Sequence, residues 1–107
     1  MTKFNELGID DSILLAVQEL GFEKPTEVQE KTIPTVLNEK TDLVALAQTG
    51  TGKTAAFGIP LLQYVDTKNK KAQSIILSPT RELCLQITNE LKLYAKHSPK
   101  IKIVAVY

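Results

Sequence analysis

A short apolar run that leads directly into a glycine-rich segment is the feature that most restricts how this chain can fold. Leu43 to Ala47 is wholly apolar, as expected of a strand that is buried on both faces of a sheet. The next residues include Gly50 and Gly52 and lead into a helical pattern. A buried strand, a glycine-rich turn and a helix in this order predict a parallel α/β unit.

The rest of the chain alternates between helical and extended patterns. Apolar spacing and capping residues predict helices over residues 13–20, 25–39, 55–65 and 83–94, with a kink at Pro34. Gly58 and Pro60 should weaken or bend the third of these helices. Short apolar runs predict two more strands over residues 74–77 and 101–107. Strands that alternate with helices imply a parallel sheet with helices on both faces. No helix follows the third strand, so we expect the fold to be truncated, with one sheet edge uncovered.

Composition places the chain among soluble globular domains. It has 107 residues, of which 43% are hydrophobic, enough for one domain with its own core. The first residues contain no apolar segment of the secretory type, which favours the cytoplasm. One cysteine and one histidine exclude an internal disulfide and a zinc cluster. The net charge of +1 provides no general attraction to nucleic acid, so any such contact must be local.

The glycine-rich segment fits the P-loop, a turn that holds nucleotide phosphates. Its residues are Ala47, Gln48, Thr49, Gly50, Thr51, Gly52, Lys53 and Thr54, with alanine where the strict motif has its first glycine. Glycines with positive φ let successive backbone N–H groups turn inward around a phosphate. Lys53 would then place its charge on the β and γ phosphates, and the Thr54 hydroxyl would join the shell of Mg2+. The alternative is a simple glycine turn beside an exposed lysine.

Hydrolysis of a nucleotide requires more than this phosphate site. A carboxylate at the tip of a neighbouring strand holds the magnesium, and a second polar group orients the attacking water. The strand over residues 74–77 leads into Ser78 and Pro79, and the last strand ends at Tyr107. Neither supplies a carboxylate, so Lys53 and Thr54 are the catalytic candidates that remain. We therefore expect these 107 residues to bind ATP weakly and not to hydrolyse it alone.

Three motifs, in this order, resemble those of the DEAD-box RNA helicases. The segment GFEKPTEVQ, from Gly21 to Gln29, resembles the Q motif, and Phe4 lies 17 positions before it. The segment AQTGTGKT resembles the P-loop of that family, and PTREL, which begins at Pro79, resembles its motif Ia. The resemblance implies the first RecA-like domain of a superfamily 2, ATP-dependent RNA helicase. Residues 1–40 would hold the Q-motif helices, 41–66 the P-loop unit and 74–107 an incomplete motif Ia unit.

The resemblance assigns the nucleotide base to Phe4, Phe22, Lys24 and Gln29. A glutamine amide can pair with the N6 and N7 edge of adenine and rejects guanine, whose O6 is an acceptor. Phe4 would stack on the face of the base, and the backbone near Lys24 would add a contact. Thr26 and Gln29 also have the spacing of a helix capping box. A capping role is therefore the alternative, and the two roles can coexist.

For the third motif, the resemblance implies contacts with the phosphate backbone of single-stranded RNA by Pro79, Thr80, Arg81 and Glu82. Thr80 can donate from its hydroxyl, and Arg81, the sole arginine of the chain, can form a fork with a phosphate. Such contacts do not read the base sequence. The alternative is that Thr80 only caps the helix and that Arg81 forms an internal ion pair.

Two other functions remain open at this point. One is an enzyme of another P-loop class, such as a small-molecule kinase or a different ATPase. The other is a nucleotide-binding or interaction module without catalysis. The bare strand over residues 101–107 also predicts that the chain associates with a second copy or exchanges elements with it. For the helicase, unwinding and ATP hydrolysis are expected of a longer protein that also carries the Asp-Glu-Ala-Asp motif and a second domain.

Overall fold

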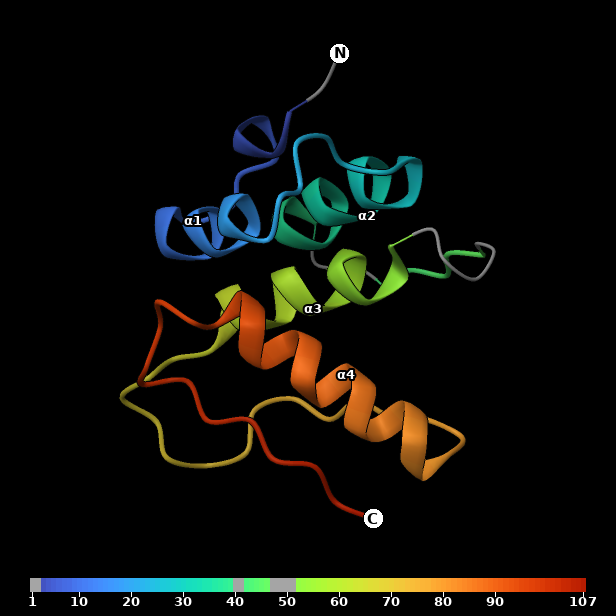
Figure 1. Cartoon of the computed structure of the whole chain (residues 1–107), viewed down its shortest axis with the longest axis vertical. Helices are drawn as coiled ribbons and strands as arrows, with labels where there is room; N and C mark the ends of the chain where they lie inside the picture. Colours follow the sequence, from blue (N-terminus) through green and yellow to red (C-terminus); the bar gives the residue numbers. More distant parts are fainter. Residues whose placement is uncertain (1–2, 40–41, 47–51) are drawn as a thin grey trace.

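The regular secondary structure of the computed structural model is helical in the residues that it describes, which are 3–39, 42–46 and 52–107. A short 3-10 helix, η1, covers Phe4–Glu6. The α-helices are α1 (Asp11–Glu19), α2 (Glu27–Asn38), α3 (Lys53–Tyr64) and α4 (Arg81–Tyr94). Figure 1 shows their arrangement. Each predicted helix is confirmed, and its ends lie close to those expected from the sequence.

Local side chains and one glycine set several helix ends. Thr26 precedes α2 and its Oγ1 accepts a hydrogen bond from the Gln29 backbone N at 3.4 Å. Thr80 precedes α4 and its Oγ1 accepts from the Leu83 backbone N at 3.2 Å. Such caps satisfy N–H groups that have no partner within the helix. Gly21 follows α1 with φ of +84°, a left-handed conformation that glycine adopts readily.

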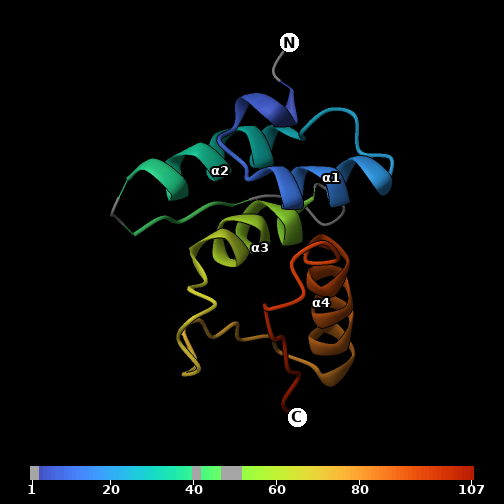
Figure 2. The same cartoon turned by 90° about the vertical axis from the view of Figure 1, so that its left-hand side faces the viewer.

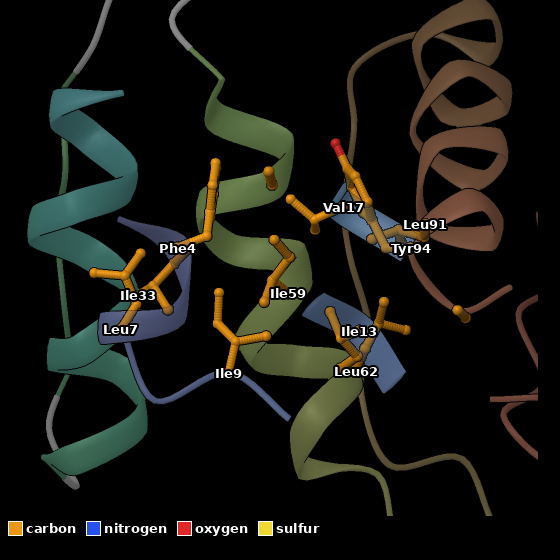
Figure 3. Close-up of a cluster of buried hydrophobic side chains, with 12 residues drawn as sticks. Phe4, Leu7, Ile9, Ile13, Val17, Ile33, Ile59, Leu62, Leu91 and Tyr94 are labelled. Atoms are coloured by element: carbon orange, nitrogen blue, oxygen red, sulfur yellow. The ribbon is translucent and has the colours of Figure 1, made fainter. Parts of the chain in front are cut away.

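The hydrophobic core lies where the helices meet, and α3 contributes its centre. α3 packs against α2 and against α4, and α1 packs against α4, an arrangement that Figure 2 shows from a second side. Val17, Ile33 and Ile59 have no exposed surface, and Figure 3 shows them among the other apolar side chains of the cluster. Burying one such side chain stabilises a fold by about 1.5–3 kcal/mol.

Two helix-breaking residues lie inside α3 without interrupting it. The helix continues through Gly58 and Pro60, and both are buried. A Cβ at Gly58 would lie 2.4 Å from Leu91 Cδ2, so glycine is the residue that lets α4 approach this closely. The weakening expected from Gly58 is thus offset by contact with a neighbouring helix. The kinks expected from Pro34 and Pro60 remain predictions.

The parallel sheet predicted from the sequence is absent from the described residues. Residues 42–46, 72–78 and 101–107 form no strand, and no backbone hydrogen bond between described residues joins these segments. A strand requires such bonds to a neighbour. Much of their apolar surface is exposed, with relative exposures of 85% for Val44, 90% for Leu77 and 85% for Val106. The predicted boundaries of the units 1–40, 41–66 and 74–107 remain a prediction.

None of the described helices has the length and apolar character that a membrane crossing requires.

Candidate functional site

The side chain of Gln29 joins the start of α2 to the start of α3. Its Oε1 accepts a hydrogen bond from the Thr26 backbone N at 2.9 Å, and its Nε2 donates to the Gly52 carbonyl oxygen at 3.1 Å. Only 3% of the residue is exposed. The capping box predicted as the structural alternative is confirmed. The bond to Gly52 adds a contact between two motifs that are 23 positions apart.

Gly52 is the residue immediately before α3, and its position requires glycine for two reasons. Its backbone is left-handed, with φ of 84° and ψ of 29°, which costs residues with a Cβ roughly 1–2 kcal/mol. A Cβ here would also lie 2.3 Å from Gln29 Nε2 and 3.2 Å from Thr26 Oγ1. The Gly52 carbonyl accepts from the Ala56 backbone N at 3.2 Å as well as from Gln29. Both the left-handed backbone and the close neighbouring side chains therefore favour glycine at position 52.

The first turn of α3 carries two of the predicted phosphate-binding residues. Lys53 begins the helix and is exposed, while Thr54 is half-buried. Among the described residues, no side chain caps this helix, and its first turn contains no acidic residue. The N–H groups and the positive dipole end of a helix start suit an anion. The residues present fit a phosphate group at this helix start.

The remaining P-loop residues, Ala47, Gln48, Thr49, Gly50 and Thr51, lie outside the described residues. Their contribution to a phosphate site remains a prediction.

The two phenylalanines of the predicted base site differ in exposure. Phe4 is 4% exposed and its ring stacks on that of Phe22, with centroids 6.4 Å apart and an angle of 25° between the planes. Phe22 is 39% exposed. Burial of the large apolar Phe4 side chain in the core is more favourable than its exposure to water. Figure 3 shows Phe4 and Ile33 in the same cluster. Stacking of Phe4 on a base would require its ring to leave this cluster.

The start of α4 contains the predicted RNA-binding residues and remains open to solvent. Pro79, Thr80, Arg81 and Glu82 are all exposed. Thr80 caps the helix, as the structural alternative predicted. Arg81 lies over the ring of Tyr107, with its Cζ 4.5 Å from the ring centroid. None of the ion pairs between described residues includes Arg81.

Sequence reasoning missed several residues that hold the site in place from a distance. Gln63, on α3, accepts at Oε1 from the Asp10 backbone N at 2.8 Å and donates from Nε2 to the Gly8 carbonyl at 2.9 Å. Tyr64 donates to the carbonyl oxygens of Val36 and Leu37, near the end of α2. These bonds link segments distant in sequence, so no local spacing could have revealed them.

Charged and ionisable groups reinforce the packing of α1 against the end of α4. Hydrogen bonds from Lys96 and His97 hold the pKa of the Glu19 carboxyl below its ordinary value. Burial, and to a lesser degree the charge of Glu90, raises the pKa of Tyr94 to about 12. Tyr94 is 4% exposed, so its phenol remains neutral in the folded protein at physiological pH.

A family model and several relatives match this chain. The model described as "DEAD/DEAH box helicase" matches residues 26–107. Over its whole length, the chain is 51% identical to the ATP-dependent RNA helicase CshA of Listeria monocytogenes and covers 20% of that protein. The chain therefore spans about a fifth of the length of such relatives.

Solved structures of similar proteins agree with the helical arrangement described above. A DEAD box protein from the hyperthermophile Methanococcus jannaschii matches with a TM-score of 0.83 and 48% identity, over 88% of this chain and 26% of that one. S. cerevisiae Dbp5 bound to RNA and ADP BeF3 matches with a TM-score of 0.86 and 34% identity, over 91% of this chain and 25% of that one.

Proposed function

The chain belongs to the DEAD/DEAH box helicase family, and from this premise we propose that it is the ATP-binding, RNA-contacting part of an ATP-dependent RNA helicase. The observation that carries the proposal is the hydrogen bond from Gln29 Nε2 to the Gly52 carbonyl at 3.1 Å. It brings the segment that resembles the Q motif onto the last glycine of the P-loop. In this proposal, base recognition and phosphate binding belong to one site.

Lys53 and Thr54 are the residues that would hold the triphosphate and Mg2+. The lysine ammonium offers a point charge to the phosphates, and the threonine hydroxyl is a suitable ligand for Mg2+. The start of α3, which no side chain of the described residues caps, adds the N–H groups and the positive dipole end that suit an anion. When bound, Mg-ATP supplies the phosphoanhydride bond that an ATPase cleaves. ATP hydrolysis and the local separation of short RNA duplexes are proposed for the longer protein.

Gln29 can serve as a helix cap and as an adenine reader at the same time. A carboxamide has two N–H donors and two acceptor lone pairs. The bond from Thr26 uses one lone pair, and the bond to Gly52 uses one N–H donor. One donor and one lone pair are left for the N6 and N7 edge of adenine. Because only 3% of Gln29 is exposed, adenine pairing requires the neighbouring segments to open a path. Phe22, whose ring is partly exposed, is the better placed aromatic residue for stacking on the base.

The start of α4 is the proposed contact with the RNA backbone. The Thr80 oxygen accepts the capping bond from Leu83, so the hydroxyl hydrogen remains available to a phosphate. Arg81 is exposed, and its guanidinium carbon lies 4.5 Å from the centroid of the Tyr107 ring. The related Dbp5 has been solved with bound RNA, which supports RNA as the ligand. The contact would be independent of base sequence.

The extended segments support a parallel sheet in the longer protein. Their exposed apolar side chains include Val44, Ile75, Leu77, Val104 and Val106. α3 and α4 both begin on the right-hand side of Figure 1, as successive crossover helices do beside a parallel sheet. Additional strands of the RecA-like domain would pair with these segments and cover them.

The 107-residue chain alone is proposed to associate with a second copy through the same extended segments. A compact monomer in light scattering at high concentration would argue against this association. A cytoplasmic location is also part of the proposal.

Base selectivity in the full-length helicase tests the proposed nucleotide site. Lys53→Ala should weaken Mg-ATP and Mg-GTP alike, because both carry the same phosphates. Gln29→Ala should weaken the binding of ATP more than that of GTP. The difference should be about tenfold, the effect of losing one neutral hydrogen bond and leaving its buried partner unpaired. Affinities from isothermal titration would provide the measurement, with Gln18→Ala, an exposed glutamine of α1, as the matched control.

Two results would favour the other functions. Equal loss of ATP and GTP affinity on Gln29→Ala would favour another P-loop enzyme, such as a kinase. Absence of RNA-stimulated phosphate release from the full-length protein would favour a module without catalysis.

A further inference from the structure

Arg81 is the first residue of α4, and its side chain is held by an aromatic ring from the far end of the chain. The guanidinium Cζ lies 4.5 Å from the centroid of the Tyr107 ring, within the range of a cation–π contact. Tyr107 is 71% exposed, so its ring contributes little to the core. The contact therefore needs a reason other than burial of the tyrosine.

The contact with the Tyr107 ring is a cation–π contact and not a hydrogen bond to the N–H donors of Arg81. The N–H donors of a guanidinium lie in its plane and form the fork that matches a phosphate. The Tyr107 ring lies against the Arg81 guanidinium carbon, and no ion pair between described residues occupies the N–H donors of Arg81. An ion pair with a carboxylate would instead consume those donors. The contact with Tyr107 therefore leaves the N–H donors of Arg81 available to a phosphate.

A second contact fixes the segment that carries Tyr107. The Cys84 Sγ lies 3.9 Å from the Val106 carbonyl oxygen, so the last residues of the chain run against the first turns of α4. Figure 1 places the C-terminus near the end of α4 from which Arg81 projects. Two neighbouring residues, Val106 and Tyr107, thus contact the same region of the helix.

We propose that Tyr107 is a positioning residue that holds the Arg81 guanidinium in the orientation in which it binds an RNA phosphate. A free arginine side chain has many rotamers, and most of this freedom is lost when it binds. The Tyr107 ring restricts these rotamers before RNA arrives, so less freedom is lost on binding. The inference rests on the proposed contact between Arg81 and RNA and assigns a residue that supports that contact.

The test measures the affinity of the full-length protein for a single-stranded oligouridine by fluorescence anisotropy over a series of salt concentrations. Arg81→Ala should weaken binding and lower the salt slope by about one phosphate contact. Tyr107→Leu, which removes the ring, should weaken binding by about two- to fivefold, the range of an exposed cation–π contact. Tyr107→Phe keeps the ring and should bind as the unchanged protein does. Asn89→Ala, at an exposed and uncharged position further along α4, is the matched control.

A double variant separates positioning from direct contact with RNA. If Tyr107 acts only through Arg81, Tyr107→Leu should cause no further loss in the Arg81→Ala background. Full affinity of Tyr107→Leu, with Arg81→Ala weakened, would overturn the positioning role but leave the RNA contact. Additive losses would overturn it too, because Tyr107 would then act independently. Full affinity of Arg81→Ala would remove both the proposed RNA contact and the positioning role.

Discussion

The starts of α3 and α4 differ in the hydrogen bonds made by the residue that precedes each helix. Thr80 precedes α4, and its side chain accepts a hydrogen bond from the Leu83 backbone N three residues away. Gly52 precedes α3 and has no side chain, and Gln29, from a different helix, donates to its carbonyl. That bond satisfies none of the N–H groups of α3, and no side chain of the described residues caps them. N–H groups without such a cap suit a phosphate, so the difference separates a candidate nucleotide site from a self-capped surface.

Gly52→Ala should have the largest effect on stability and ATP binding, because it strains the backbone at residue 52 and disturbs the hydrogen bond from Gln29. The left-handed φ costs roughly 1–2 kcal/mol for alanine, and displacing the Gln29 amide costs about 1 kcal/mol for each of its two hydrogen bonds. We therefore expect a loss of roughly 3–4 kcal/mol in unfolding free energy, measured by urea denaturation, and loss of ATP binding.

Gly21→Ala is the matched control for this substitution. Gly21 has the same φ of +84°, yet nothing lies within 4 Å of the position of its Cβ. Its variant should lose only the backbone part, roughly 1–2 kcal/mol, and should still bind ATP. Equal losses of stability for the two variants would show that the contact between Gly52 and Gln29 contributes nothing.

Thr80→Ala should have a smaller effect, because it removes one local cap. Loss of a threonine cap costs about 1 kcal/mol, and Thr80→Ser should restore most of that stability. Thermal unfolding followed by circular dichroism would measure both variants. If the two helix starts differ as described, Thr80→Ala leaves ATP affinity unchanged. If Thr80→Ala lost as much ATP affinity as Gly52→Ala, the starts of α3 and α4 would not differ in nucleotide binding.

The sequence predicted the helices well because their signals are local. Thr26 and Thr80 cap helices, Gly21 follows the end of one, and Leu91 of the predicted helix over residues 83–94 is buried in the core. The strands were predicted from apolar runs alone, but a strand forms only when a neighbour supplies hydrogen bonds. In the described residues, no such neighbour adjoins the segments around Val44 or Leu77, so their apolar pattern produces exposed extended chain.

Some contacts at the candidate site could be predicted from the sequence, and others could not. The capping spacing of Thr26 and Gln29 could be read directly, and it formed. The bond from Gln29 to Gly52 and the contact between Arg81 and Tyr107 could not be predicted, because each joins residues more than 20 positions apart. The burial of Phe4 was missed for the same reason: its exposure depends on packing against residues such as Phe22 and Ile33.

Titration of the full-length protein with Mg-ATP, followed by nuclear magnetic resonance, tests the joint site most directly. The Gln29 side-chain amide and the backbone amides of Gly52, Lys53 and Thr54 should shift together, since one nucleotide would contact both motifs. The Leu83 amide, which Thr80 caps, should move far less. Shifts at Lys53 and Thr54 with an unmoved Gln29 amide, or no shift at any of these groups, would contradict a shared adenine and phosphate site.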